Sequence, residues 1–266
     1  MSRSTPPHLW GGVWRSQTEG LSAQQKDNLC GPYWAARVLV EAAFTEFAGE
    51  AIDEDLIAAR AGTTLPDPLG GPYVPPGATS LTTYRNQLPI VAAAESGTSP
   101  AGLVRAIESL SDGALRCVPI RGRWTADRVE RLVEQAPGLG ARLIANVRTG
   151  CLWGSRPDPD VLLGELAGEQ VQGPPPDWDV GHFVELAMLV RGPKNALVAV
   201  RDSYPTLGWN GHHLQPPRVI AAALLRGDGR AGGVLAVLPA KHADAVEPIA
   251  RELGLEVGVW DNGCRS

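Results

Sequence analysis

The sequence predicts an α+β domain. Apolar residues recur at three- and four-residue steps between Cys30 and Phe47, which is the pattern of a long, largely buried helix. Two apolar, β-branched runs, 182–191 and 196–202, flank a four-residue turn, which is typical of an antiparallel hairpin. The chain has 266 residues, 44% of them hydrophobic, and can therefore bury a sizeable core.

The first half of the chain is expected to be mainly helical. Gly49 is placed to end the first helix, and Asp53 or a neighbouring residue is placed to cap a short second helix that runs to Arg60. The segment 62–80 is crowded with Gly, Pro and Thr and is expected to hold no regular structure. It is either the rim of a substrate groove or an ordinary surface loop. A third helix is expected to begin at Ser99-Pro100.

The second half is expected to alternate strands and helices. The further expected elements are strand 114–120, helix 125–135, strand 141–147, helix 217–225, strand 233–238, helix 242–253 and strand 255–260. A Trp- and Pro-rich insertion, 150–180, precedes the hairpin and holds one short helix at 160–166. The expected organisation is a domain over 1–230, with insertions at 62–80 and 150–180, and a β-α-β extension over 231–266 packed on the same domain.

Charge and hydropathy exclude two classes of partner. The net charge of -5, the pI near 5.6 and the lack of a Lys/Arg cluster argue against nucleic-acid binding. No segment approaches the roughly 18 consecutive apolar residues of a membrane-spanning helix, and residues 1–10 lack the apolar stretch of a secretory signal. We therefore expect a cytoplasmic protein without a membrane partner.

Cysteine and histidine spacing predicts neither disulfides nor a metal site. The four cysteines are widely scattered, without a Cys-x-x-Cys pair, and are expected to be free thiols. His212, His213 and His242 lack the paired spacing of zinc motifs. No cofactor is expected.

Cys30 is the most informative residue of the chain. It follows a polar, turn-prone run and begins the apolar helical pattern, with Asn28 as the expected N-cap. Free N–H groups and the helix dipole favour a thiolate in the first turn of a helix, and the thiolate is the nucleophilic form. Taken alone, Cys30 is better explained as a small apolar residue of a core helix.

His182 and Asp202 stand at opposite ends of the predicted hairpin. Because the start of one strand faces the end of its antiparallel partner, we expect these two side chains to lie close together. Each alone has an ordinary interpretation, His182 as a strand-end histidine and Asp202 as a turn former. Together with Cys30 they supply the nucleophile, base and orienting carboxylate that acyl transfer needs.

Further candidates surround these three residues. Gln24, six residues before Cys30, could donate its side-chain amide to an oxyanion beside the Cys30 N–H, with Gln25 as the alternative; either could equally be part of a solvated turn. The candidates for substrate binding are the aromatic and acidic residues Trp34, Trp153, Trp178, Asp179 and Trp209. Packing of the insertions on the core, and for Asp179 a solvated turn, are the alternative interpretations.

The order of these motifs resembles the papain-like cysteine peptidases that process bacteriocin precursors at double-glycine leaders, as a stand-alone member. The matching stretches are Gln24 followed by Cys30-Gly31-Pro32, then Gly181-His182-Phe183-Val184, then Val200-Arg201-Asp202 with Pro205 and Gly208. The resemblance implies a papain-like α+β fold with the nucleophile helix packed on a mainly antiparallel sheet. It implies Cys30 as nucleophile, His182 as general base, Asp202 as orienting residue and Gln24 in the oxyanion hole.

The chain departs from the family pattern in several places. Ser203 and Tyr204 follow Asp202 where the family has Pro directly, and Glu185 replaces an apolar residue. The expected function is a cysteine peptidase or amide hydrolase that cleaves a peptide or peptide-like substrate, such as a precursor or leader peptide of a modified natural product. Two alternatives stay open: an acyl or peptidyl transferase that uses the same residues with an amine acceptor, and a non-catalytic peptide-binding domain of the same fold.

Overall fold

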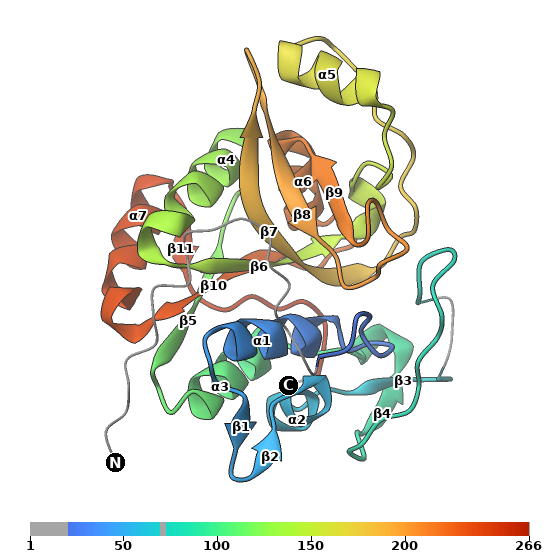
Figure 1. Cartoon of the computed structure of the whole chain (residues 1–266), viewed down its shortest axis with the longest axis vertical. Coiled ribbons are helices and arrows are strands. Elements are labelled where there is room, and N and C mark those ends of the chain that lie inside the picture. Colours follow the sequence, from blue (N-terminus) through green and yellow to red (C-terminus); the bar gives the residue numbers. More distant parts are fainter. Residues whose placement is uncertain (1–20, 70–72, 266) are drawn as a thin grey trace.

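The computed structural model describes residues 21–69 and 73–265, and its centre is a seven-stranded sheet (Figure 1). The strand order is β11-β5-β10-β6-β7-β8-β9, and all neighbouring strands are antiparallel. The strands are β5 (Leu115–Arg121), β6 (Arg142–Arg148), β7 (Gly181–Arg191), β8 (Ala196–Arg201), β9 (His212–Gln215), β10 (Gly233–Pro239) and β11 (Glu256–Val257).

Helices cover both faces of this sheet (Figure 1). One face carries α1 (Cys30–Glu41), α2 (Glu54–Ala61) and α3 (Pro100–Leu110), and the other carries α4 (Ala126–Gln135), α6 (Pro217–Leu225) and α7 (Val246–Glu252). Helix α5 (Pro159–Ala167) lies at the turn of the β7–β8 hairpin, where the Leu166 carbonyl accepts hydrogen bonds from the backbone N–H groups of Lys194 and Asn195. The mixed α and β composition predicted from the sequence is confirmed.

Short elements complete the chain. Strand β1 (Glu46–Phe47) pairs with β2 (Glu50–Ala51), and β3 (Leu65–Asp67) pairs in parallel with β4 (Ile90–Ala92). The 3₁₀ helices are Ala93–Glu95, Ala136–Leu139, Thr149–Cys151 and Ala240–Ala245.

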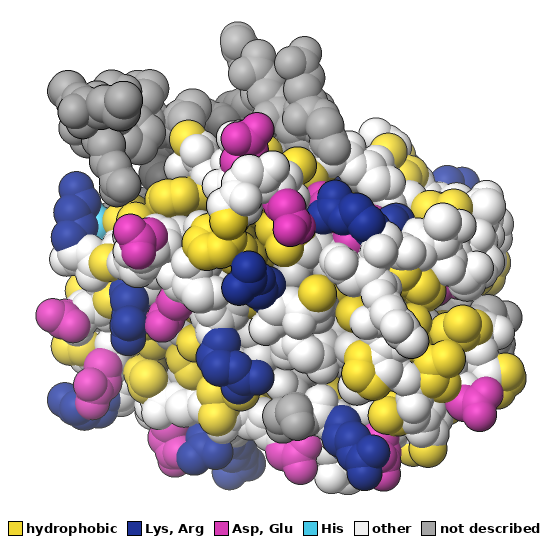
Figure 2. All heavy atoms as spheres, turned by 90° about the horizontal axis from the view of Figure 1, so that it is seen from below, with side chains coloured by type: hydrophobic (Ala, Val, Ile, Leu, Met, Phe, Trp, Pro, Cys, Tyr) yellow, Lys and Arg dark blue, Asp and Glu magenta, His cyan; other side chains and the backbone are white. Residues whose placement is uncertain are grey.

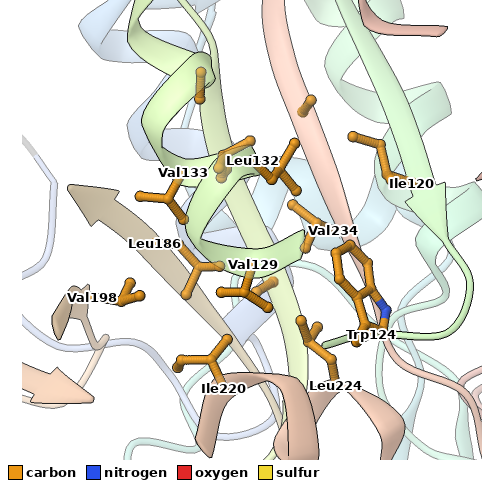
Figure 3. Close-up of a cluster of buried hydrophobic side chains, with 14 of the residues drawn as sticks. Ile120, Trp124, Val129, Leu132, Val133, Leu186, Val198, Ile220, Leu224 and Val234 are labelled. Atoms are coloured by element: carbon orange, nitrogen blue, oxygen red, sulfur yellow. The ribbon is translucent and has the colours of Figure 1, made fainter. Parts of the chain in front are cut away.

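The alternation of side chains along each strand divides the apolar core in two. On β10, Val234, Ala236 and Leu238 pack toward α4, α6 and α7, as Figure 3 shows for Val234. Leu235 and Val237 of the same strand pack toward α1, α2 and α3. Each fully buried apolar side chain contributes about 1.5–3 kcal/mol, so both cores hold the sheet and fix the helices against it.

Capping residues set where several helices begin. Asp53 Oδ1 accepts a hydrogen bond from Leu56 N at 2.9 Å, as predicted for α2. Ser99 Oγ accepts one from Gly102 N at 3.1 Å at the start of α3, where Pro100 occupies the first helical position. Gly62 ends α2 at φ 72°.

Some expected boundaries were wrong. Helix α1 ends at Glu41 and not at Phe47, because Ala43 takes φ 70° and Phe44 N bonds back to the Leu39 carbonyl. The segment 62–80 contains the three-residue strand β3, which hydrogen bonds to distant β4. Strand β9 was not predicted, and the last strand is only two residues long.

The described part of the predicted extension, residues 231–265, is an integral part of the sheet and not an appendage to it. Its first strand, β10, lies between β5 and β6 and hydrogen bonds to both. Only β11 lies at the edge, against β5. The pattern of a strand, a helix and a strand was correct, but the pairing partners of β10 are more than 80 residues away in the chain, and local periodicity carries no information on them.

The surface is mixed in charge. On the face seen in Figure 2, basic and acidic side chains alternate over short distances. In residues 21–69 and 73–265 there is no helix with the length and apolar character needed to cross a membrane.

Candidate active site

Cys30 is the first residue of α1, on the helix face that meets the sheet. The residue before it, Leu29, occupies the N-cap position without a side-chain hydrogen bond, so Asn28 does not cap the helix as expected. Asn28 instead takes a left-handed conformation at φ 63°, which turns the chain into the helix. The first-turn N–H groups of α1 therefore receive no side-chain cap, and the Cys30 side chain, partly exposed, lies beside them.

Cys30 lines an open groove of about 910 Å³. The groove runs between the start of α1, the end of β6, the start of β7 and the C-terminal segment. Its walls include Asn28, Cys30, Tyr73, Gly97, Asn146, Arg148, Asp179, Gly181, Arg226, Arg230 and Cys264. Tyr73 of segment 62–80 lines this groove. A separate hollow of about 480 Å³ near Arg37 and Glu54 does not include Cys30.

The predicted closeness of His182 and Asp202 is confirmed. His182 Nε2 lies 3.2 Å from Asp202 Oδ1, and the same carboxylate oxygen accepts a hydrogen bond from Tyr204 N at 3.1 Å. The His182 ring packs in a cluster with two aromatic rings: Tyr204 stacks on it at 5.9 Å between centroids, Trp178 meets it edge-to-face at 5.1 Å, and the Trp178 and Tyr204 rings lie 5.5 Å from each other. These contacts leave the imidazole little freedom to rotate.

The charges around His182 favour its protonated form. Burial alone lowers the pKa of His182, but the negative charges of Asp202 and Cys30 and hydrogen bonds to both side chains outweigh burial and raise the pKa to about 10. Burial likewise disfavours the charged form of Asp202, yet His182 holds the pKa of that carboxyl below its usual value. Because Nε2 faces Asp202, Nδ1 is the His182 nitrogen left for Cys30.

The structure places the two glutamines differently from the expectation. Gln24 Nε2 donates to the Thr79 carbonyl at 2.6 Å, so its amide is engaged by the 62–80 segment and not directed at Cys30. Gln25 is buried, and its Oε1 accepts a hydrogen bond from Ser203 Oγ at 2.5 Å. Ser203 Oγ in turn lies 3.5 Å from His182 Nε2, so Gln25 reaches the site through Ser203.

Two of the five candidates for substrate binding lie near Cys30 or His182. Asp179 is an exposed wall residue of the groove and pairs with Arg148, and Trp178 contacts the His182 ring. The prediction that Trp34 binds substrate was wrong. Trp34 is 1% exposed within the core, and its Nε1 donates to the Phe183 carbonyl at 3.1 Å. A side chain so placed cannot reach a substrate.

The other two tryptophans lie outside the groove walls. Trp209 is 52% exposed in the turn before β9, where its N–H donates to the His212 carbonyl. Trp153 packs under Arg218, with the guanidinium carbon 5.3 Å from the ring centroid. Its main chain binds the Gln215 side chain at both N and O, which indicates a structural role for the 150–180 insertion.

Sequence reasoning missed three residues of this region. Cys264 lines the same groove as Cys30, and burial, with a smaller effect from Cys30, raises the pKa of its thiol to about 11. His213 lies next to Asp202, and Gln215 contacts His213. The alternation within His212-His213-Leu214-Gln215 places His213 and Gln215 on one strand face, and that pattern could have identified the pair.

The described ranges contain no group of three His, Cys, Asp or Glu side chains arranged to hold a metal ion. Residues 16–261 match the model of a family of unknown function, DUF6885. The chain belongs to this family. No curated protein matches the chain. The inference on function therefore rests on the geometry around Cys30.

Proposed function

We propose that this DUF6885 member is a cysteine peptidase or amide hydrolase that cleaves a peptide substrate through a thioester on Cys30. The supporting observation is the buried His182, whose Nε2 lies 3.2 Å from Asp202 Oδ1 and whose pKa is raised by Asp202 and Cys30 together. This is the order of nucleophile, base and orienting carboxylate that acyl transfer needs. The open groove that contains Cys30 gives an extended chain access to it.

The proposed reaction has two steps. Cys30 Sγ, its proton already on His182, attacks the carbonyl carbon of the scissile amide, and the imidazolium returns that proton to the leaving amine as the C–N bond breaks. A water molecule then gives a proton to His182 and attacks the thioester, which releases a carboxylic acid and restores the thiol. We assign the stabilisation of the oxyanion of both steps to the N–H groups in the first turn of α1.

The same geometry supports a papain-like arrangement, with the nucleophile at the start of a helix that packs on the strand bearing the histidine. Trp34 of α1 donates to the Phe183 carbonyl next to His182, and this hydrogen bond fixes the helix against β7. Gln24 does not contribute to the proposed oxyanion hole unless its bond to Thr79 opens. We therefore assign the oxyanion to the backbone N–H groups.

Alkylation tests the nucleophile. We expect iodoacetamide at about pH 6 to modify Cys30 at least tenfold faster than Cys151, because a thiolate paired with His182 reacts while an ordinary thiol stays protonated. Cys151 is a matched internal control, since it is also partly exposed and burial raises the pKa of its thiol. The His182→Ala variant is expected to remove the preference for Cys30. Equal rates at Cys30 in both proteins would refute the ion pair.

A peptide mixture incubated in H₂¹⁸O tests the reaction. Hydrolysis places ¹⁸O in the new carboxyl group, whereas transfer to an added amine gives an amide without ¹⁸O, and mass spectrometry separates the two products. The Cys30→Ser variant is the control. Reactive Cys30 with neither product would favour the non-catalytic peptide-binding alternative, which binding of an intact peptide would then reveal.

A further inference from the structure

Asp202 faces a second imidazole besides His182. Its Oδ1 bonds to His182, while its Oδ2 lies 4.0 Å from His213 Nε2, and the His213 side chain is 3% exposed. His213 comes from β9, the strand next to the β8 strand that ends before Asp202. The mechanism described above does not use His213, although it is buried and adjacent to the orienting carboxylate.

The Gln215 side chain fixes the tautomer of His213. Trp153 N donates to Gln215 Oε1 at 2.9 Å, and Gln215 Nε2 donates to the Trp153 carbonyl at 2.9 Å. This pair of bonds determines which end of the amide is the nitrogen. The same Nε2 lies 3.0 Å from His213 Nδ1. Because an amide nitrogen only donates, Nδ1 must accept, and the proton of the neutral ring is on Nε2.

The proton on Nε2 therefore points at Asp202. At 4.0 Å the contact is longer than a hydrogen bond, and it acts as an N–H dipole facing a carboxylate in a site removed from water. Burial is the main reason that the pKa of His213 lies below its usual value, which keeps the ring neutral. Besides Asp202, the ionisable groups that act on His213 are Asp177, His182 and His212.

We propose that His213 is a positioning residue: held by Gln215 and the Trp153 main chain, its Nε2–H orients Asp202 so that the carboxylate meets His182. This inference deepens the proposed function and rests on it. It gives the 150–180 insertion a role, because Trp153 carries the hydrogen bonds at the outer end of the chain of contacts Trp153, Gln215, His213, Asp202 and His182. Trp153 then supports the site without contacting the substrate.

The test compares His213→Leu, which removes the donor, with His213→Gln, whose amide nitrogen reaches a position similar to Nε2. We expect His213→Leu to slow alkylation of Cys30 at neutral pH about tenfold, the equivalent of one pKa unit, and to shift the NMR titration of His182 to lower pH. His213→Gln is expected to restore most of both. His212→Leu is the matched control, since His212 is the neighbouring residue of the same strand and lies on the opposite strand face from His213. Unchanged alkylation and titration in folded His213→Leu would overturn the proposal.

Gln215→Glu tests the tautomer even if His213→Leu does not fold. A glutamate in this position can only accept a hydrogen bond, so it favours the tautomer with the proton on Nδ1. We expect ¹⁵N NMR of the His213 ring to show Nδ1 without a proton in the natural protein and with a proton in the variant. A natural protein with its proton on Nδ1 would overturn the proposal. These readouts do not require peptide cleavage. If the variants give the expected alkylation and NMR results but the protein cleaves no peptide, only the proposed function is refuted and the role of His213 stands.

Discussion

His182 Nε2 lies 3.2 Å from Asp202 Oδ1, and both side chains are 2% exposed. A carboxylate and an imidazole this far removed from water are stable together only when each compensates the other, because an isolated buried charge costs several kcal/mol. The stability of this pair therefore depends on the protonation state of His182.

Stability is expected to fall as the pH rises through the titration of His182. The pKa is about 10 in the folded protein, against roughly 6.5 for an unperturbed histidine. A raised folded pKa contributes stability that is complete below about pH 6.5 and is lost as the pH approaches 10. The difference in the free energy of unfolding between the natural protein and His182→Gln, measured in urea, should shrink from pH 7 to pH 10. A difference that grows with pH contradicts this assignment.

Gly211→Ala is expected to disturb Asp202. Gly211 has φ 79°, and an added Cβ would lie 2.8 Å from the Asp202 carbonyl oxygen. Its own carbonyl accepts from Asp202 N at 2.6 Å. The left-handed conformation alone costs an alanine about 1 kcal/mol. Gly229→Ala is the matched control, with φ 77° and no atom within 4 Å. Urea unfolding should show the greater loss for Gly211→Ala, together with slower alkylation of Cys30. Equal effects of both substitutions contradict the contact.

Glu185→Gln is expected to destabilise the fold strongly. Glu185 is buried on β7 and pairs with Arg142 and Arg201, which hold the pKa of its carboxyl below the usual value despite burial. Removing one partner of a buried ion pair costs about 3–5 kcal/mol. Glu247→Gln, in an exposed pair with Arg251, is the control and should cost less than about 1 kcal/mol. Similar midpoints of urea unfolding for the two variants contradict the prediction.

Trp34→Phe separates packing from substrate binding. The substitution removes the hydrogen bond from Nε1 to the Phe183 carbonyl and leaves that buried acceptor unpaired, at a cost of about 1–3 kcal/mol. Because Trp34 is in the core, we expect lower stability and an unchanged KM for any peptide that the protein cleaves. A raised KM with unchanged stability would return Trp34 to the substrate site.

Local patterns predicted much of this architecture. The hairpin of β7 and β8 was predicted because periodicity and the turn residues 192–195 agree, and its geometry then brought His182 to Asp202 without further information. Helix α2 and helix α3 begin at the predicted residues because their caps act within one turn. These features depend only on neighbours in the sequence.

The remaining features depend on distant contacts. The apolar residues after Glu41 continue the helical pattern, yet Ala43 leaves the helix at φ 70° and is exposed, and Phe44 packs against the core shared by α1, α2 and α3. Gln24 has the spacing of an oxyanion residue, but the carbonyl of Thr79, 55 residues away, binds its amide. The roles of His213 and Gln215 depend on β9 pairing with β8 and on Trp153, 62 residues before Gln215.

The position of β10 has a consequence for the order of folding during synthesis. Strands β5 and β6 leave the ribosome long before β10, and the gap between them stays open until residues 233–239 arrive. Until then, each of the two exposes an unpaired edge, which is a template for pairing with other chains. Sheets closed by such distant pairings fold slowly. Nascent chains stalled before residue 233 should therefore aggregate or recruit chaperones, although they already contain Cys30, His182 and Asp202.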